Sequence, residues 1–225
     1  MNSVTTRALR LVLWRLALTG WAIFGPARTW NYWQGWVFLA AFFIPEFGLL
    51  IYLARHDQGL LERRLKGGMG AEQRPLQKAV MFLVMISFSL MIISSSRDHQ
   101  INPSAVPPEL IGMADGLLIL GQWVVFRVFR ENTFGSITIG TVPGQRVIST
   151  GPYAWVRHPM YSGFLLGYLT IPLALGSWRG LAFSGGLLLA FVIRLLDEER
   201  FLRQSLPGYA EYCQTVPDRL IPKVW

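Results

Sequence analysis

Six apolar segments dominate the chain of 225 residues and limit what it can fold into. A helix that crosses the hydrocarbon core of a bilayer needs about 20 predominantly apolar residues. Four segments meet this length comfortably and two are short, and only Ser177 separates the last two. The segments are 8–24, 32–54, 76–96, 107–129, 160–176 and 178–196. This pattern predicts an all-α, polytopic transmembrane bundle of five to six helices with a C-terminal helical hairpin.

The composition agrees with a membrane environment and excludes two classes of function. Hydrophobic residues make up 52% of the chain and charged residues only 15%, too little polar surface for a soluble domain of this size. The net charge of +8 comes from basic residues placed between apolar runs, so no nucleic-acid partner is expected. Cys213 is the single cysteine, and the three histidines are far apart, so no metal site is expected.

The basic residues also predict an orientation, because loops that remain in the cytoplasm are enriched in Lys and Arg. With the N-terminus inside and an even number of spans, all but Arg28, Arg97 and Arg179 of the 21 basic residues fall on the inner side. Arg15 interrupts the first apolar segment, and Trp21 stands where a signal peptide would need a small residue. We therefore expect a retained first span and cytoplasmic N- and C-termini.

Three long polar segments, 55–75, 130–157 and 197–225, fall on this same predicted cytoplasmic side. Any chemistry that uses a soluble cofactor is expected there. The glycine-rich stretch 66–70 follows no predicted strand, and Gln73 breaks the dinucleotide-binding pattern. It is interpreted as a basic loop near anionic lipid.

Small and ionisable residues inside the apolar segments each carry a prediction. Glycines four residues apart let neighbouring helices approach closely. Two such pairs are Gly112 with Gly116 and Gly163 with Gly167. Glu46 and Asp115 are ionisable residues within predicted spans, where a charge is costly and a functional role is one hypothesis. A helix break at Glu46, after Pro45, is the alternative.

The segment 149–163 combines features that have ordinary explanations one by one. Gly-Pro forms a turn, Pro159 suits the first turn of a helix, and the aromatic residues are typical of a membrane interface. Together they place a helix N-terminus, with its free N–H groups, beside Arg157, His158 and the phenols of Tyr153 and Tyr161. This arrangement is typical of a site for an anion or a nucleotide.

The second polar group follows the predicted hairpin, which returns the chain to the same side. Residues 194–200 read Arg-Leu-Leu-Asp-Glu-Glu-Arg. One interpretation is a salt-bridged helix end, since Arg194 with Glu198 and Glu199 with Arg203 are four residues apart. However, three consecutive carboxylates near the C-terminal end of an apolar helix oppose the helix dipole. The sequence therefore favours a functional site that faces the aromatic turn.

Residues 131–225 resemble the isoprenylcysteine carboxyl methyltransferase and phospholipid methyltransferase family of integral membrane enzymes. The resemblance rests on Gly-x-Tyr at 151–153, Arg-His-Pro-x-Tyr-x-Gly at 157–163, the hairpin, the Glu pair and the tail at 207–212. It implies a cofactor-binding region at 131–225, with a pocket on the cytosolic side. It also implies that the N-terminal helices, residues 1–130, form the substrate cavity, which faces the lipid.

The resemblance implies S-adenosylmethionine as the cofactor, S-adenosylhomocysteine as its product, and no metal. The residues that it assigns to the cofactor are Gln145, Arg146, Val147, Ile148, Tyr153, His158, Pro159, Met160, Tyr161, Gly163, Glu198 and Glu199. Arg194 matches a residue near the substrate and the reacting centre, so Arg194 and Glu198 are the predicted catalytic residues.

The expected acceptor is a lipophilic molecule from the bilayer, with an isoprenylcysteine-like carboxylate, a phospholipid amine and a small thiol all open. A bacterial inner membrane is the expected location. Two other functions remain: an NADPH-dependent reductase of the sterol-reductase type, which shares an Arg-His-Pro-x-Tyr element, and a non-enzymatic transporter or scaffold. The Glu pair and the convergent charged cluster favour methyl transfer over both.

Overall fold

The computed structural model describes residues 3–68 and 70–225, and helices are the regular elements of these residues. Met69 of the glycine-rich stretch lies outside the described residues. The first part of the chain forms α1 (Ser3–Ala27), α2 (Trp33–His56), α3 (Gln58–Lys66), α4 (Pro75–Ile101) and α5 (Pro108–Glu131). The second part forms η1 (Gly151–Ala154), α6 (Pro159–Tyr168), α7 (Ile171–Ala174), η2 (Arg179–Phe183), α8 (Ser184–Ser205) and α9 (Tyr209–Thr215).

Five helical stretches are long and apolar enough to cross a membrane. They are Ser3–Ala27, Trp33–His56, Pro75–Ile101, Pro108–Glu131 and Arg179–Ser205. The predicted polytopic helical bundle is therefore confirmed. The apolar segment 160–176 instead breaks into α6 and α7. At the break, Thr170 Oγ1 donates to the Gly167 carbonyl at 2.7 Å, and Pro172, which has no N–H, follows.

The outer surface of the bundle is apolar in the way that a lipid environment requires. Large side chains such as Trp14, Ile44, Phe82 and Met113 are more than half exposed on four different helices. In water, apolar patches of this extent are rare on a monomer. Together with the five apolar helices, this surface identifies an integral membrane protein.

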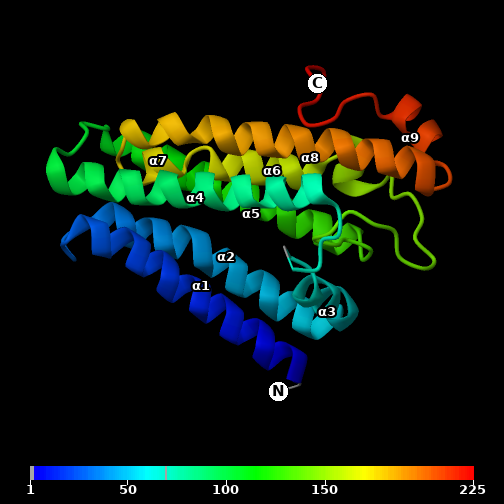
Figure 1. Ribbon diagram of the computed structural model, residues 1–225, viewed down its shortest axis with the longest axis horizontal. Coiled ribbons are helices and arrows are strands. Elements are labelled where there is room, and N and C mark those ends of the chain that lie inside the picture. Colours follow the sequence, from blue (N-terminus) through cyan, green and yellow to red (C-terminus); the bar gives the residue numbers. More distant parts are fainter. Residues whose placement is uncertain (1–2, 69) are drawn as a thin grey trace.

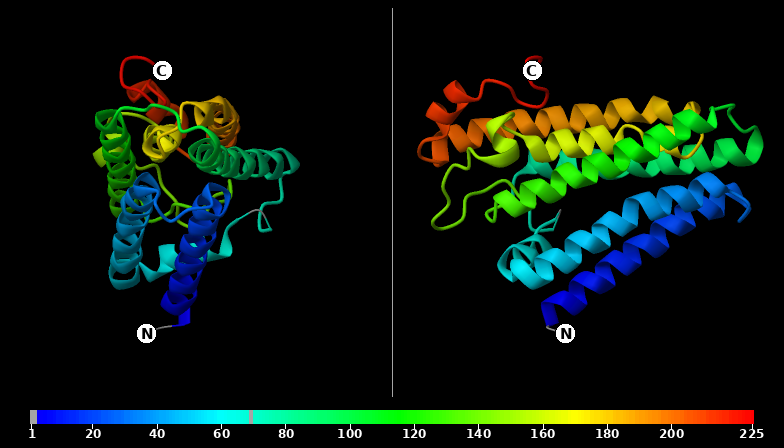
Figure 2. Two further views of the ribbon diagram at one scale, coloured as in Figure 1. Left: turned by 90° about the vertical axis from the view of Figure 1, so that its left-hand side faces the viewer. Right: turned by 180° about the vertical axis from the view of Figure 1, so that it is seen from behind.

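The helices α4, α5, α6 and α8 run along the long axis of the molecule, and α1 and α2 are inclined to them (Figure 1). The strongest contacts join α5 to α6, α4 to α8, α1 to α4 and α2 to α5. Figure 2 shows α6 near the middle of the bundle when it is viewed from one end. The loop after α5, α3 and α9 gather toward one end, and both termini lie on that side (Figure 1). We call this the pocket end, formed by residues 57–68, 70–74, 132–158 and 206–225.

Glycines allow the close contact between α5 and α6. A Cβ added at Gly121 would lie 2.3 Å from the Gly163 carbonyl oxygen and 3.0 Å from the Gly167 nitrogen. This finding agrees with the packing role expected for Gly163 and Gly167. The same expectation was wrong for Gly112 and Gly116, where an added Cβ would meet nothing within 4 Å, because both face away from their neighbours.

Replacing Gly121 tests whether this contact determines how α5 and α6 pack. We expect Gly121→Ala to destabilise the bundle by about 1–3 kcal/mol, because the new methyl group meets rigid backbone atoms. Gly116→Ala on the same helix is the matched control and should be neutral or slightly stabilising, since its added methyl group meets no neighbour. Thermal unfolding in detergent measures both variants. Equal effects would contradict the packing role.

Candidate functional site: a pocket at one end of the helical bundle

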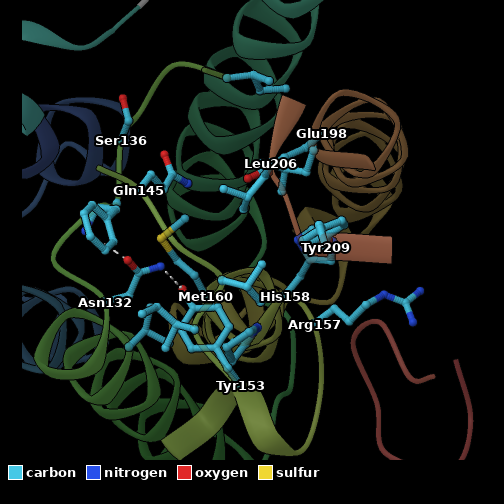
Figure 3. A pocket seen from close by; sticks show the side chains of 18 of the residues that line it. Asn132, Ser136, Gln145, Tyr153, Arg157, His158, Met160, Glu198, Leu206 and Tyr209 are labelled. Atoms are coloured by element: carbon cyan, nitrogen blue, oxygen red, sulfur yellow. Dashed lines mark hydrogen bonds between the residues drawn. The ribbon is translucent and has the colours of Figure 1, made fainter. Parts of the chain in front are cut away.

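A pocket at the pocket end is lined by both the N-terminal and the C-terminal parts of the chain (Figure 3). Its walls come from the end of α5, the loop 132–148, η1, the start of α6, α8 and α9. In Figure 3, Glu198 on α8 and Met160 on α6 reach toward the middle, whereas Arg157 turns toward the C-terminal tail. The pocket crosses the division expected at 130/131, because Val128 and Phe129 of α5 also line it.

The turn before α6 requires a glycine at its start. Gly151 has a φ of +59°, in the left-handed region that side chains disfavour. A Cβ at this position would also lie 3.0 Å from the carboxylate of Glu131. Thr150 Oγ1 donates to that carboxylate, which ties the turn to the end of α5. The Gly-Pro turn predicted from the sequence is therefore held against the end of α5.

Tyr153 is fixed in this turn by contacts on both sides. Asn132 Nδ2 donates to the Tyr153 phenol oxygen at 2.9 Å, and the Tyr212 hydroxyl donates to the Tyr153 carbonyl at 2.7 Å. Burial raises the pKa of Tyr153 to about 12, although the hydrogen bond from Asn132 acts in the opposite direction. The ring is therefore a neutral, aromatic wall of the pocket at physiological pH.

The Glu199 carboxylate joins three segments of the chain beneath the pocket. Its Oε1 accepts from Arg157 Nε at 2.6 Å, and its Oε2 accepts from Arg219 Nε at 3.0 Å. Arg157 Nη1 also donates to the carbonyls of Val216 and Pro217, at 2.8 Å and 2.6 Å. The side chains of Glu199 and Arg157 are 5% and 3% exposed, so this is a buried ion pair. We call Glu199, Arg157 and Arg219 the Glu199 cluster.

His158 links this cluster to the start of α6. Its backbone N–H donates to the Arg219 carbonyl at 3.0 Å, and its Nε2 lies 3.3 Å from Glu199 Oε1. Its ring stacks on the Tyr161 ring, with centroids 5.6 Å apart and an interplanar angle of 11°. Ser162 Oγ, one turn on, donates to the Leu220 carbonyl at 2.7 Å. The C-terminal tail therefore fixes the first turn of α6.

A chain of polar groups runs along the inner side of the pocket. The Tyr161 hydroxyl donates to Glu198 Oε2 and accepts from Arg194 Nε at 3.1 Å. Arg194 Nη1 donates to Gln77 Oε1 at 3.0 Å, and Gln77 Nε2 donates to Asp197 Oδ2 at 2.5 Å. Gln77 lies on α4, so this chain connects α4, α6 and α8. It places the predicted catalytic pair, Arg194 and Glu198, on opposite sides of one phenol.

The structure brings most of the residues predicted for the cofactor together. Ten of those twelve line the pocket: Gln145, Arg146, Val147, Ile148, Tyr153, His158, Pro159, Met160, Tyr161 and Glu198. The other two lie elsewhere, Gly163 against Gly121 and Glu199 in its ion pairs. Arg194 lies behind Tyr161, outside the lining residues. The alternative interpretation of this segment, a helix end with Arg194 paired to Glu198 and Glu199 paired to Arg203, is not found among the ion pairs of the described residues.

Sequence reasoning missed several residues that shape the site. Asn132 holds Tyr153, and Tyr209 and Tyr212 close the pocket from α9. The two tyrosines belong to the tail motif at 207–212, to whose aromatic rings the resemblance assigns no role. Gln77 gave one signal, a polar residue at the start of an apolar segment, but its partners are more than one hundred residues away in sequence.

The two ionisable residues within predicted spans have different surroundings. Glu46 forms an ion pair with the half-exposed Arg15 of α1, so these two charges compensate each other. Asp115 is 6% exposed, and neither of its carboxylate oxygens has a hydrogen-bond partner among the described residues. Neither residue lines the pocket.

Comparisons with known proteins agree with the motif resemblance. Residues 110–207 match the model of the phospholipid methyltransferase family, which confirms the family predicted from the motifs for this region. Delta(14)-sterol reductase from Mus musculus is 31% identical over 52% of this chain and 33% of its own length. The cobalt-zinc-cadmium resistance protein CzcN from Cupriavidus metallidurans is 40% identical over 45% of this chain and 47% of its own length. The chain thus spans less than half the length of either relative.

The Glu199 cluster leads to a stability prediction. Glu199→Gln leaves the buried Arg157 guanidinium without its counter-charge, so we expect a loss of about 3–5 kcal/mol in unfolding free energy. Glu62→Gln is the control, because it removes a carboxylate from an exposed pair with Lys66 and should change stability little. Urea or thermal unfolding in detergent measures both. A Glu199→Gln variant as stable as the control would show that the cluster does not hold the turn and tail together.

Proposed function

We propose that the protein, which matches the phospholipid methyltransferase family over residues 110–207, is a membrane-embedded methyltransferase that uses S-adenosylmethionine. One observation carries the proposal most strongly. The motif residues of three distant segments, 145–148, 153–161 and 198, converge on a single pocket beside the Arg194–Tyr161–Glu198 chain. The acceptor in this proposal is a lipophilic molecule that arrives from the bilayer.

The side chains of the pocket suit the parts of S-adenosylmethionine. The Glu198 carboxylate offers a counter-charge to an ammonium group, and the first turn of α6 offers N–H groups to a carboxylate. The rings of Tyr153 and Tyr209 offer aromatic faces to an adenine. These features support binding of the cofactor and its product, S-adenosylhomocysteine, with residues 131–225 supplying most of the contacts.

When bound, S-adenosylmethionine supplies a methyl group on a positively charged sulfur, and transfer forms the bond to the acceptor as the methyl–sulfur bond breaks and leaves neutral S-adenosylhomocysteine. The residues of the chain contribute position and shielding. The Tyr161 hydroxyl keeps its proton and donates a hydrogen bond to Glu198, which fixes the orientation of that carboxylate. Arg194, held by Tyr161 and Gln77, orients the acceptor. Correct alignment of two reactants supplies as much as about 7–11 kcal/mol of rate acceleration.

The proposal also assigns an orientation in the membrane. The pocket end carries most of the basic loop residues, and loops rich in Lys and Arg remain in the cytoplasm. Both termini lie toward this end, which supports cytoplasmic termini and access to a soluble cofactor (Figure 1). A bacterial inner membrane fits this arrangement.

Titration of detergent-purified protein with S-adenosylmethionine, S-adenosylhomocysteine and NADPH tests the proposal by calorimetry. We expect the two adenosyl ligands to bind and NADPH not to bind. The similarity to a sterol reductase makes NADPH the informative comparison. Selective binding of NADPH would contradict the proposal and would indicate a reductase instead.

Two variants assign the predicted roles. Glu198→Ala should abolish binding of S-adenosylhomocysteine, because it removes the counter-charge in the pocket. Arg194→Ala should retain that binding within about fivefold, because Arg194 lies outside the lining residues. The same variant should lose methyl transfer, because it can no longer orient the acceptor. Glu211→Ala on α9 is the control for loss of a nearby exposed carboxylate. Transfer is followed with radiolabelled S-adenosylmethionine into lipid extract, small thiols and prenylcysteine analogues. Unchanged binding by Glu198→Ala would remove Glu198 from the site.

A further inference from the structure

Arg194 is a buried cation whose hydrogen-bond partners are all neutral. The residue is 9% exposed. Its Nε donates to the Tyr161 hydroxyl at 3.1 Å, its Nη1 donates to Gln77 Oε1 at 3.0 Å, and its Nη2 donates to the Ile137 carbonyl. None of the ion pairs found among the described residues includes Arg194. Each of its three nitrogens therefore has one neutral acceptor, while no direct contact neutralises its charge.

Three carboxylates lie near Arg194, and none of them touches it. Glu72 attracts it from the side of the loop 132–148, where its Oε2 accepts from the Ile139 N–H, and a neutral group stands between Arg194 and each of the other two. Tyr161 lies between Arg194 and Glu198, and Gln77 lies between Arg194 and Asp197. Asp197 instead pairs with Arg74, whose Nη2 lies 2.8 Å from Asp197 Oδ1. Arg194 is therefore separated from Glu198 and Asp197 by side chains that carry no charge.

Gln77 is fixed in the orientation that this separation requires. Its side chain is fully buried on α4, the helix that packs against α8. Because a carboxylate only accepts, the amide nitrogen must face Asp197, at 2.5 Å, and the amide oxygen then faces Arg194. A glutamate at this position would place a negative charge directly on Arg194, and an apolar residue would leave the guanidinium without a support.

A buried cation that lacks a directly paired carboxylate is only partly neutralised by more distant ones, so a structure that keeps one gains from binding an anion. Tyr161 and Gln77 hold Arg194 from helices, whereas the Ile137 carbonyl belongs to the loop 132–148. An anionic group is able to take the place of that loop carbonyl without disturbing the helices. An amine would be repelled by the same charge unless it arrived neutral.

We propose that Gln77 is a positioning residue that keeps Asp197 from neutralising Arg194, so that Arg194 is free to bind an anionic group of the acceptor. The inference rests on the proposed function and narrows it to acceptors that carry an anionic oxygen or sulfur. Gln77 acts through Arg194 and does not contact the acceptor.

A binding experiment in nonionic detergent tests this role without relying on turnover. The probes are decylthioacetic acid, which carries a carboxylate, and its primary amide, which has nearly the same shape and no charge. Both are titrated into the wild-type protein with and without saturating S-adenosylhomocysteine. We expect the acid to bind at least about tenfold more tightly than the amide. Equal affinities would overturn the inference.

Gln77→Glu separates a charge effect from a structural one. The affinity for the acid should fall about tenfold as the pH rises through the range in which the introduced carboxyl ionises, while the affinity for the amide stays constant. Gln77→Leu should weaken acid binding by a factor that does not depend on pH. Gln122→Glu is the control for a new charge in the bundle, because Gln122 is a partly buried glutamine on a different helix, α5, and donates to the Phe42 carbonyl.

Binding of S-adenosylhomocysteine separates failure of this inference from failure of the proposed function. Gln77 does not line the pocket, so each Gln77 variant should bind S-adenosylhomocysteine within about twofold of the wild type. If the wild type binds this ligand but its preference for the acid is unaffected by Gln77→Glu at any pH, the role of Gln77 is wrong. If the wild type does not bind it at all, the proposed function is wrong instead.

Discussion

The candidate site depends on the ion pairs that the Glu199 carboxylate forms with two arginines. Its two oxygens pair with Arg157 in the turn before α6 and with Arg219 in the C-terminal tail, which lie 42 and 20 residues away in sequence. Separating these partners would leave a buried charge without its counter-charge, which is costly. The ion pairs therefore hold α8, the turn and the tail in one arrangement. Residues one apart on a helix lie about 100° apart around its axis, so Glu198 faces the pocket while Glu199 faces the tail. Glu198 therefore belongs to the site, and Glu199 supports the site from outside.

Helix packing inside the membrane brings the other half of the pocket into place. Gly121 and Gly163 allow the backbones of α5 and α6 to meet, and this contact carries the end of α5 to the first turn of α6. Asn132, directly after α5, then reaches the Tyr153 hydroxyl, and Gln77 of α4 reaches Arg194 of α8. The site thus combines a scaffold of spans with a short set of charges at their ends, and neutral bridging groups keep the charge of Arg194 available.

The sequence predicted the helical bundle and the segments that form the pocket because both depend on local patterns. Apolar length gives the spans, and the Gly-Pro turn with Pro159 gives the start of α6. The individual contacts of Glu199, Gly163 and Gln77 could not be predicted in this way, because each depends on a partner far away in the chain. The salt-bridged helix end, the alternative to a functional site at 194–200, is not formed, because Arg194 and Glu199 bind partners far away in the sequence. The periodicity of apolar residues likewise could not show that the segment 160–176 breaks near Thr170. Pro172 is compatible with such a break, but a proline alone does not locate it.

Photochemical labelling tests the central claim, that the pocket at residues 145–161 and 198 binds S-adenosylmethionine. Ultraviolet irradiation of the detergent-purified protein with radiolabelled S-adenosylmethionine, followed by trypsin digestion and mass spectrometry, locates the bound cofactor directly. The pocket predicts label on the tryptic peptides 147–157 and 158–179, which contain Tyr153 and Tyr161, and loss of that label with excess S-adenosylhomocysteine. Label confined to peptides of α1 or α2, or label displaced by NADPH and unaffected by S-adenosylhomocysteine, would contradict the account.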